Sequence, residues 1–250
     1  RDRLLHHAIY RIIYPYCDRL FISDSYSCRL GKGTHRAINR FRDFGRKVSK
    51  NHTKTCWVLK CDIRKFFASV DHQMLLKILD KYILDTDIVW LLERIITSFH
   101  STKAGVGLPL GNLTSQLLVN IYMNIFDHWM KHIMKIKYYI RYADDFVILH
   151  TDKDYLLELT PKIANFLEEN LKLQLHPGKV FIKTFASGVD FLGWVHFPTH
   201  RVLRTATKKK MFRNLASKEG GKLNNSKASY LGMLKHGNGH KLSRKIYNLG

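Results

Sequence analysis

The chain has 250 residues and carries 42 lysine and arginine residues against 20 aspartate and glutamate residues, a formal net charge of +22 at pH 7. Such a basic excess indicates a polyanionic partner, and nucleic acid is favoured over a membrane surface because no long amphipathic basic helix stands alone. The longest apolar stretch, Leu117–Ile125, is too short to cross a bilayer and contains two asparagines, so we expect no membrane-spanning segment in this sequence. The length fits one large domain or two to three small subdomains.

Hydrophobic periodicity predicts helices first and then a mixture of strands and helices. The predicted helices are, in chain order, residues 3–16, about 35–49, 72–83, 87–99, 113–134 and one that starts at Thr160-Pro161. The predicted strands are residues 57–63, two segments of 138–149 that meet at Ala143-Asp144-Asp145, and a hairpin of 180–185 and 189–197 around Ser187-Gly188. Asp71 and Thr86 are the expected N-caps of the third and fourth helices.

Composition changes after about residue 200. Residues 201–250 contain thirteen lysines and arginines but a single acid, Glu219, which predicts a domain boundary at this point. The four cysteines show no CxxC spacing, so we expect reduced thiols in the core of a cytoplasmic protein and no structural zinc site. They are Cys17, Cys28, Cys56 and Cys61.

Three aspartates occupy positions where an ionised carboxylate is costly. Asp62 closes the apolar strand 57–63, and Asp144 and Asp145 lie between two apolar segments. Buried carboxylates require a partner or a bound cation. An Asp-Asp pair alone is usually an ordinary turn feature, but strand sequence on both sides and a third strand-borne aspartate make this set more specific.

Nucleotidyl transfer gives such a cluster a purpose. Two divalent ions about 3.5–4 Å apart activate an attacking 3′-hydroxyl and stabilise the leaving pyrophosphate. Mg²⁺ prefers hard oxygen ligands and leaves positions open for water and substrate phosphates. Carboxylates that converge from two strands are the ligands this reaction needs.

Five sequence blocks resemble reverse transcriptases, and they follow the order found in that family. They are Asp62–Phe67, Gly107–Asn112, the YxDD box Tyr142–Asp145, Leu173–Lys179 and Phe191–Trp194. Residues 1–8 and 27–37 resemble the fingers segments of the bacterial branch. The resemblance implies an α+β right-hand polymerase of fingers, palm and thumb, with an antiparallel palm sheet backed by helices. It also implies template RNA, an RNA–DNA hybrid and deoxynucleoside triphosphates as partners, and no membrane partner.

The loop expected beside the incoming nucleotide indicates which branch of the reverse transcriptases the sequence resembles. Pro109-Leu110-Gly111 stands where most bacterial relatives, including group II intron maturases, have Pro-Gln-Gly. Together with Gly111–Gln116 and Phe197–Arg201, it resembles reverse transcriptases of diversity-generating retroelements, which copy a template RNA with errors concentrated at adenines. That branch implies a bacterial, archaeal or phage-encoded enzyme with a small basic oligomeric accessory protein as a candidate partner. The alternatives are a maturase-like or defence-associated reverse transcriptase and, from another class, a non-catalytic RNA-binding or splicing factor on a polymerase fold.

The resemblance assigns roles residue by residue. Asp62 and Asp144 would bridge two Mg²⁺ ions, for which Mn²⁺ could substitute, Asp145 would assist, and the main-chain oxygen of Ile63 would complete one coordination shell. The residues expected beside the incoming nucleotide are Arg64, Lys65, Phe66, Phe67, Leu110, Gly111, Gln116 and Lys179. The expected primer grip is Phe191, Leu192, Gly193 and Trp194. The residues expected to bind nucleic acid are Arg29, Lys32, Arg36, Lys208, Lys209 and Lys210.

Two of these residues would have distinct tasks. Phe67 matches the aromatic steric gate that excludes a ribose 2′-hydroxyl, and Lys179 matches a lysine proposed to protonate pyrophosphate. Ordinary roles stay open as well: core packing for Phe67 and Leu110, a helix cap for Gln116, and a solvated surface for Lys179 and the lysine run.

The expected organisation is fingers at 1–55, palm at 56–71, a fingers–palm connection at 72–111, palm with the primer-grip hairpin at 112–199, and a basic thumb at 200–250. In the family, basic fingers residues that clasp the triphosphate precede the Arg1-Asp2-Arg3 segment. We therefore expect that the sequence is part of a longer protein or that another residue takes their place.

Overall fold

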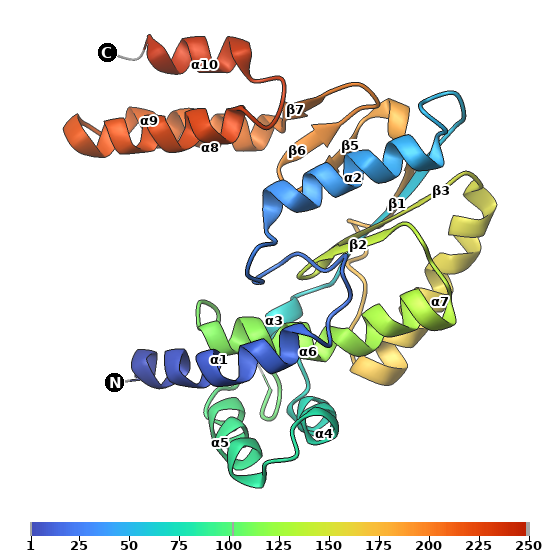
Figure 1. Ribbon diagram of the computed structural model, residues 1–250, viewed down its shortest axis with the longest axis vertical. Helices are drawn as coiled ribbons and strands as arrows, with labels where there is room; N and C mark the ends of the chain where they lie inside the picture. Colours follow the sequence, from blue (N-terminus) through green and yellow to red (C-terminus); the bar gives the residue numbers. More distant parts are fainter. Residues whose placement is uncertain (1, 102, 249–250) are drawn as a thin grey trace.

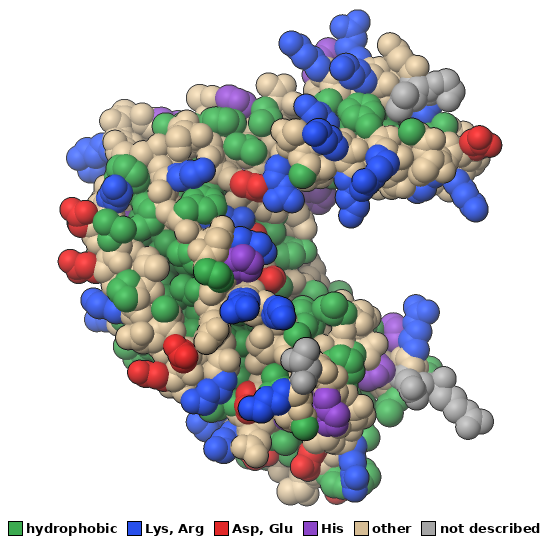
Figure 2. All heavy atoms as spheres, turned by 180° about the vertical axis from the view of Figure 1, so that it is seen from behind, with side chains coloured by type: hydrophobic (Ala, Val, Ile, Leu, Met, Phe, Trp, Pro, Cys, Tyr) green, Lys and Arg blue, Asp and Glu red, His purple; other side chains and the backbone are tan. Residues whose placement is uncertain are grey.

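The computed structural model describes residues 2–101 and 103–248, so Arg1, Thr102, Leu249 and Gly250 of the predicted domains lie outside the described residues. The molecule has the form of a C whose two arms enclose a deep cleft (Figure 2). Two sheets form the middle, helices α1 and α3 to α6 gather in one arm, and α8 to α10 form the other (Figure 1). No helix of the described residues is long and apolar enough to cross a membrane.

The central sheet has four antiparallel strands in the order β2-β3-β1-β4. They are β1 (Trp57–Asp62), β2 (Tyr139–Tyr142), β3 (Asp145–His150) and β4 (Phe181–Thr184). Alternate side chains of a strand point to opposite faces, and here both faces are covered. Phe146 and Ile148 of β3 pack in one hydrophobic cluster, whereas Val147 and Leu149 pack in another. Double coverage explains why β3 reads as a continuous apolar run.

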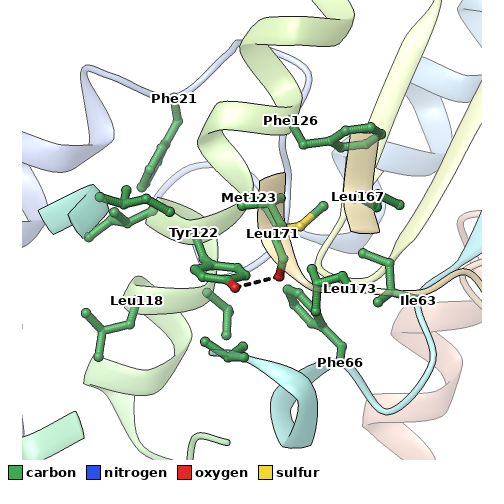
Figure 3. Close-up of a cluster of buried hydrophobic side chains, with 14 of the residues drawn as sticks. Phe21, Ile63, Phe66, Leu118, Tyr122, Met123, Phe126, Leu167, Leu171 and Leu173 are labelled. Carbon is green, nitrogen blue, oxygen red and sulfur yellow. Dashed lines mark hydrogen bonds between the residues drawn. The ribbon is translucent and has the colours of Figure 1, made fainter. Parts of the chain in front are cut away.

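Different helices cover the two faces of the central sheet. The larger cluster packs α6 (Leu113–His128) and α7 (Lys153–Leu171) against it, with Tyr122 of α6 donating a hydrogen bond to the Leu171 carbonyl at 2.6 Å (Figure 3). The other face is covered by α2 (Thr34–Val48), whose Phe41 and Phe44 are buried. The remaining helices of this part are α1 (Asp2–Asp18), α3 (Phe66–Ser69), α4 (His72–Tyr82) and α5 (Thr86–Thr97).

A second sheet has three antiparallel strands in the order β5-β6-β7. They are β5 (Val189–Phe191), β6 (Trp194–His196) and β7 (Arg201–Leu203). It leads into α8 (Thr205–Ala216), α9 (Gly220–Leu234) and α10 (His240–Tyr247). Trp194, Leu203, Met211 and Leu234 share a third cluster, and Gly237 lies so close to the Trp194 ring that a Cβ there would clash with it. The three-stranded sheet and these helices are therefore packed closely together.

Two predicted helix starts were wrong. Helix α5 begins at Thr86, but its N-cap is Asp85, whose carboxylate accepts from the backbone N–H groups of residues 87 and 88. Helix α7 begins at Lys153 rather than at Thr160, because Asp152 caps it in the same way. Pro161 lies inside α7 on an exposed face, where a missing N–H is tolerated more easily than in the core.

The second predicted hairpin was also wrong. Strand β4 pairs with β1, and β5 pairs with β6 through a turn at Leu192 and Gly193, which have φ angles of 51° and 83°. The predicted 113–134 helix ends its α-helical part at His128 and continues as a π-helical turn, Trp129–Ile133. Three of the four cysteines are buried free thiols as predicted, but Cys28 is exposed.

Candidate active site

The two strand-borne carboxylates lie directly opposite each other. In the β1–β3 ladder Asp62 pairs with Asp145, so both side chains are on the same face of the sheet. Asp144 lies in the β2–β3 turn, and its carbonyl accepts a hydrogen bond from the Ile63 N–H at 3.2 Å. This turn requires a positive φ of 55° at Ala143, a left-handed conformation for a residue with a side chain. The predicted catalytic triad is therefore gathered at one end of the central sheet.

Each strand carboxylate has a lysine partner. The Lys179 ammonium contacts both Asp62 oxygens at 3.1 and 3.2 Å, and the Lys60 ammonium lies 3.3 Å from Asp145 Oδ2. Burial raises the pKa of Asp145 to about 7, against the lowering effect of Lys60. Burial also raises the pKa of Asp144, to which the negative charge of Asp62 adds. The site thus concentrates more negative charge than its own cations neutralise.

The three carboxylates have the donor chemistry that a divalent cation needs, although they do not form a closed metal site. Among the residues that the structure describes, no three His, Cys, Asp or Glu side chains form a group that could hold a metal ion as they stand. The chemistry of the donors nevertheless fits: all are carboxylate oxygens, the negative charge of Asp62 adds to the burial that raises the pKa values of Asp144 and Asp145, and Asp145 Oδ1 is buried without a hydrogen-bond partner. A hard cation would satisfy this oxygen and offset the excess charge.

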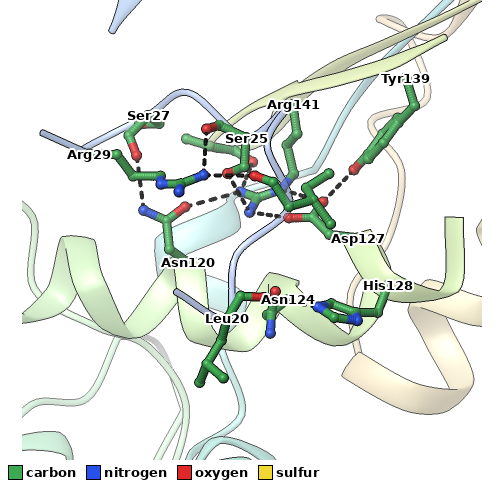
Figure 4. A network of polar contacts seen from close by, with 12 residues as sticks. Leu20, Ser25, Ser27, Arg29, Asn120, Asn124, Asp127, His128, Tyr139 and Arg141 are labelled. Carbon is green, nitrogen blue, oxygen red and sulfur yellow. Dashed lines mark hydrogen bonds and ion pairs between the residues drawn. The ribbon is translucent and has the colours of Figure 1, made fainter. Parts of the chain in front are cut away.

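A buried ion pair supports the β2–β3 turn. The Arg141 guanidinium, 0% exposed, donates to both Asp127 oxygens at 2.6 and 2.8 Å (Figure 4). Its Nη1 also donates to the Ala143 carbonyl at 3.1 Å, one residue before Asp144. Arg141 therefore connects the strained turn to the end of α6.

The same arginine connects the turn to the segment between α1 and α2. Arg141 donates to Ser25 Oγ and Asn120 Oδ1, and its backbone exchanges hydrogen bonds with Asp24 and Tyr26. Sequence reasoning missed this network. The available signal was an arginine with apolar neighbours inside a strand, which is costly unless a carboxylate elsewhere in the chain pairs with it.

Several residues predicted to face the nucleotide lie near the carboxylates. Lys65 is the N-cap of α3 and has a φ of 46°, Phe66 is buried, and Phe67 is half-buried against it. The Leu108 N–H donates to the Phe67 carbonyl at 2.8 Å, so the 105–111 loop lies beside α3. Leu110 at the end of this loop is 77% exposed and does not pack in the core.

The remaining residues of this set are placed by backbone contacts. The Arg64 N–H donates to the Gln174 carbonyl at 2.8 Å, and the His176 N–H donates to the Asp62 carbonyl at 2.7 Å, which brings the Lys179 segment to the carboxylates. Gln116 lies in the first turn of α6, where its backbone N–H donates to the Asn112 carbonyl. Gly111 has a φ of 92°.

The predicted primer grip is a tight hairpin. Phe191 and Trp194 are buried, whereas Leu192 and Gly193 form the half-exposed turn between β5 and β6. Two consecutive residues with positive φ match the twist of a short β-hairpin. The turn is therefore the part of this block that is accessible to a ligand.

The predicted nucleic-acid contacts are placed differently from one another. The Arg29 side chain is 6% exposed and donates to Asp18 and to the carbonyls of Ile22 and Ser25, which gives it an internal structural role. The Lys32 ammonium donates to the Ser23 carbonyl at 2.7 Å. The other four residues lie on helices. Arg36 on α2 and Lys209 and Lys210 on α8 are exposed, whereas Lys208 on α8 is half-buried.

The sequence matches the reverse transcriptase (RNA-dependent DNA polymerase) family over residues 1–196. The chain belongs to this family. Among curated proteins, this reverse transcriptase domain is 27% identical to Protein YkfC of Escherichia coli, over 94% of the chain and 69% of YkfC. It is 25% identical to the Putative COX1/OXI3 intron 2 protein of Saccharomyces cerevisiae, over 58% of the chain and 24% of that protein. It is 22% identical to the group II intron-encoded protein LtrA of Lactococcus lactis, over 84% of the chain and 44% of LtrA.

Solved structures show the same fold. Apo telomerase from Candida tropicalis superimposes with a TM-score of 0.65 at 11% identity, covering 84% of this domain and 44% of that chain. Telomerase from Candida albicans, in complex with a fragment of telomeric RNA, gives a TM-score of 0.58 at 12% identity over 93% of this domain and 45% of that chain. The domain thus has the polymerase fold of telomerase reverse transcriptase and spans less than half of these chains and of the two intron proteins.

Proposed function

We propose that this domain copies RNA into DNA by nucleotidyl transfer supported by two Mg²⁺ ions. The observation that carries the proposal is the pairing of Asp62 with Asp145 across β1 and β3, with Asp144 in the adjoining turn. Bound Mg²⁺ would be held by these three carboxylates and the Ile63 carbonyl, and would activate the primer 3′-hydroxyl and stabilise the leaving pyrophosphate.

Other side chains of the domain would act on the pyrophosphate, the sugar of the incoming nucleotide and the template–primer hybrid. Lys179 lies against Asp62 and is a cation with a proton to donate, which supports a role in protonating the pyrophosphate. Phe67, half-buried beside the 105–111 loop, supports steric exclusion of a 2′-hydroxyl. The exposed cations Arg36, Lys209 and Lys210 support phosphate contacts to the template–primer hybrid.

The test is Asp144→Asn, which removes one ligand charge with little change in shape. We expect primer extension on an RNA template to fall about 100-fold or more, since metal stabilisation of the transition state is worth several kcal/mol. Template affinity and the unfolding midpoint should be retained. Asp80→Asn, at an exposed position on α4, is the matched control. Near-wild-type extension by Asp144→Asn would refute the assignment of Asp144 to a catalytic metal site, whereas no extension by the wild type itself would favour a non-catalytic RNA-binding protein.

We further propose the diversity-generating branch, with errors at template adenines. Leu110 is 77% exposed at the loop beside α3, so it can meet a substrate with an apolar surface only. Shape alone discriminates by about 1–3 kcal/mol per small group, less than an unpaired polar group does. Leu110 would therefore discriminate only weakly between correctly and incorrectly paired nucleotides.

The second candidate function is that of a maturase-like reverse transcriptase. It is favoured by the relatives of the chain, which include the group II intron-encoded protein LtrA and a yeast intron protein. The two are separated by copying a defined RNA with the wild type and with Leu110→Gln, followed by cDNA sequencing. The diversity-generating proposal expects frequent misincorporation opposite adenine that falls about tenfold or more in the variant. Accurate copying by the wild type would favour the intron-type enzyme.

A further inference from the structure

A basic cavity of about 330 Å³ lies where three parts of the chain meet, away from the three carboxylates. Helix α2 contributes Arg42, the β6–β7 hairpin contributes His200 and Arg201, and the loop between α9 and α10 contributes Lys235 and His236. No aspartate or glutamate is among the described residues that line it. None of the residues proposed above to contact the nucleotide, the metal ions or the primer lines it either.

Arg201 is the unusual member of this cavity. It is only 7% exposed, and it forms no ion pair with any carboxylate of the described chain. Its Nε donates to the His236 carbonyl and its Nη2 to Asn39 Oδ1 at 2.7 Å, while Nη1 is buried without a partner. Burial lowers the pKa of Arg201, and the positive charge of Arg42 lowers it further against the weaker opposing effect of Asp43. A buried cation without a counter-charge is costly unless an anion compensates it.

The walls of the cavity are held in place. The rings of His35 on α2 and His236 stack with centroids 3.6 Å apart, and the Asn238 N–H donates to the Arg201 carbonyl at 2.8 Å. These contacts join α2, the three-stranded sheet and the α9–α10 loop around one space. Arg42 and Lys235 are exposed there, so their donors are accessible to a ligand. A cavity with fixed walls requires little reorganisation on binding.

We propose that this cavity binds a phosphate group. Phosphate oxygens accept charge-assisted hydrogen bonds from Arg42 and Lys235, and the negative charge offsets that of Arg201 behind them. The same chemistry is offered by a phosphodiester of RNA that runs outside the cleft and by free inorganic phosphate. The site does not depend on the polymerase mechanism, because it shares no residue with the carboxylate cluster.

The first experiment measures thermal unfolding without divalent metal, in phosphate and in chloride at equal ionic strength. We expect phosphate at about five times its Kd to raise the Tm of the wild type by about 2–4 °C. The double variant Arg42→Gln/Lys235→Gln should lose this rise and still fold, because both side chains are exposed. Lys77→Gln/Lys162→Gln, which removes the same charge from exposed positions on α4 and α7, should keep it.

The second experiment identifies the source of the phosphate by the salt dependence of template RNA affinity. A phosphodiester ligand predicts that the slope of log K against log salt falls by about 1.4 in Arg42→Gln/Lys235→Gln, two single-strand contacts, and stays constant in the control. An unchanged slope together with a lost phosphate shift identifies free phosphate. A wild type that shows no phosphate-specific rise, or a double variant that keeps it, overturns the proposal.

Discussion

Replacing Asp127 by Asn should destabilise the fold severely, because Asp127 is the counter-ion of a fully buried arginine. Both side chains of the Arg141–Asp127 pair are 0% exposed, and no other carboxylate of the described residues contacts the guanidinium. Removing one partner of a buried pair typically costs about 3–5 kcal/mol. In a protein of this size each kcal/mol shifts the Tm by about 2–4 °C, so the expected fall is about 6–20 °C.

The assay is thermal unfolding followed by circular dichroism for the Tm, with urea unfolding for the free energy and Asp43→Asn as the control. Asp43 pairs with Arg42 at 3.9 Å, and both side chains are 50% exposed, so its loss should change the free energy of unfolding by less than about 0.5 kcal/mol. The two substitutions are chemically identical and differ only in burial. If Asp127→Asn were no more destabilising than Asp43→Asn, the argument from the uncompensated charge of Arg141 would be refuted.

Two further predictions concern substrate choice and pH. Phe67→Val should raise ribonucleotide incorporation about tenfold or more while deoxynucleotide incorporation continues, since steric bulk is what opposes the 2′-hydroxyl; unchanged ribonucleotide incorporation would return Phe67 to a packing role. Burial lowers the pKa of His196 to about 3 from an ordinary 6.5, so the unfolded chain binds the proton more tightly and stability falls as pH falls below 6.5. Between pH 6.5 and 5 this costs about 2 kcal/mol. Urea unfolding of His196→Gln should show a correspondingly smaller loss, and an identical loss would contradict the assignment.

The features that sequence predicted well are those encoded locally. The apolar runs of β1 and β3 and the placement of Asp62, Asp144 and Asp145 follow from neighbouring residues, because both faces of the sheet are covered and the strands read as continuous apolar segments. The membership of the reverse transcriptase family that the blocks around these residues indicated is confirmed by the match over residues 1–196.

The features that sequence did not predict depend on distant partners. Strand β4 was assigned to the wrong hairpin because its pairing with β1 joins segments more than a hundred residues apart. Lys60 was not recognised as the partner of Asp145 for the same reason. The two N-caps were missed for another reason, because other helix-start residues lie downstream of each. Asp85 and Asp152 each accept hydrogen bonds from two backbone N–H groups, but Thr86 and Thr160-Pro161 are also typical of helix starts and were chosen instead.

The separation of the two sheets has a practical consequence for exchanging parts between reverse transcriptases. A junction at residue 200, where the composition changes, would separate β6 from β7 and leave Trp194 without its strand partner Leu203. A junction at Gly188, which lies between β4 and β5, cuts neither ladder. Chimeras that transplant residues 189–248 as a unit should therefore carry over the three-stranded sheet intact together with α8 to α10, provided that the acceptor supplies the contacts that α2 makes through Ile38 and Phe41.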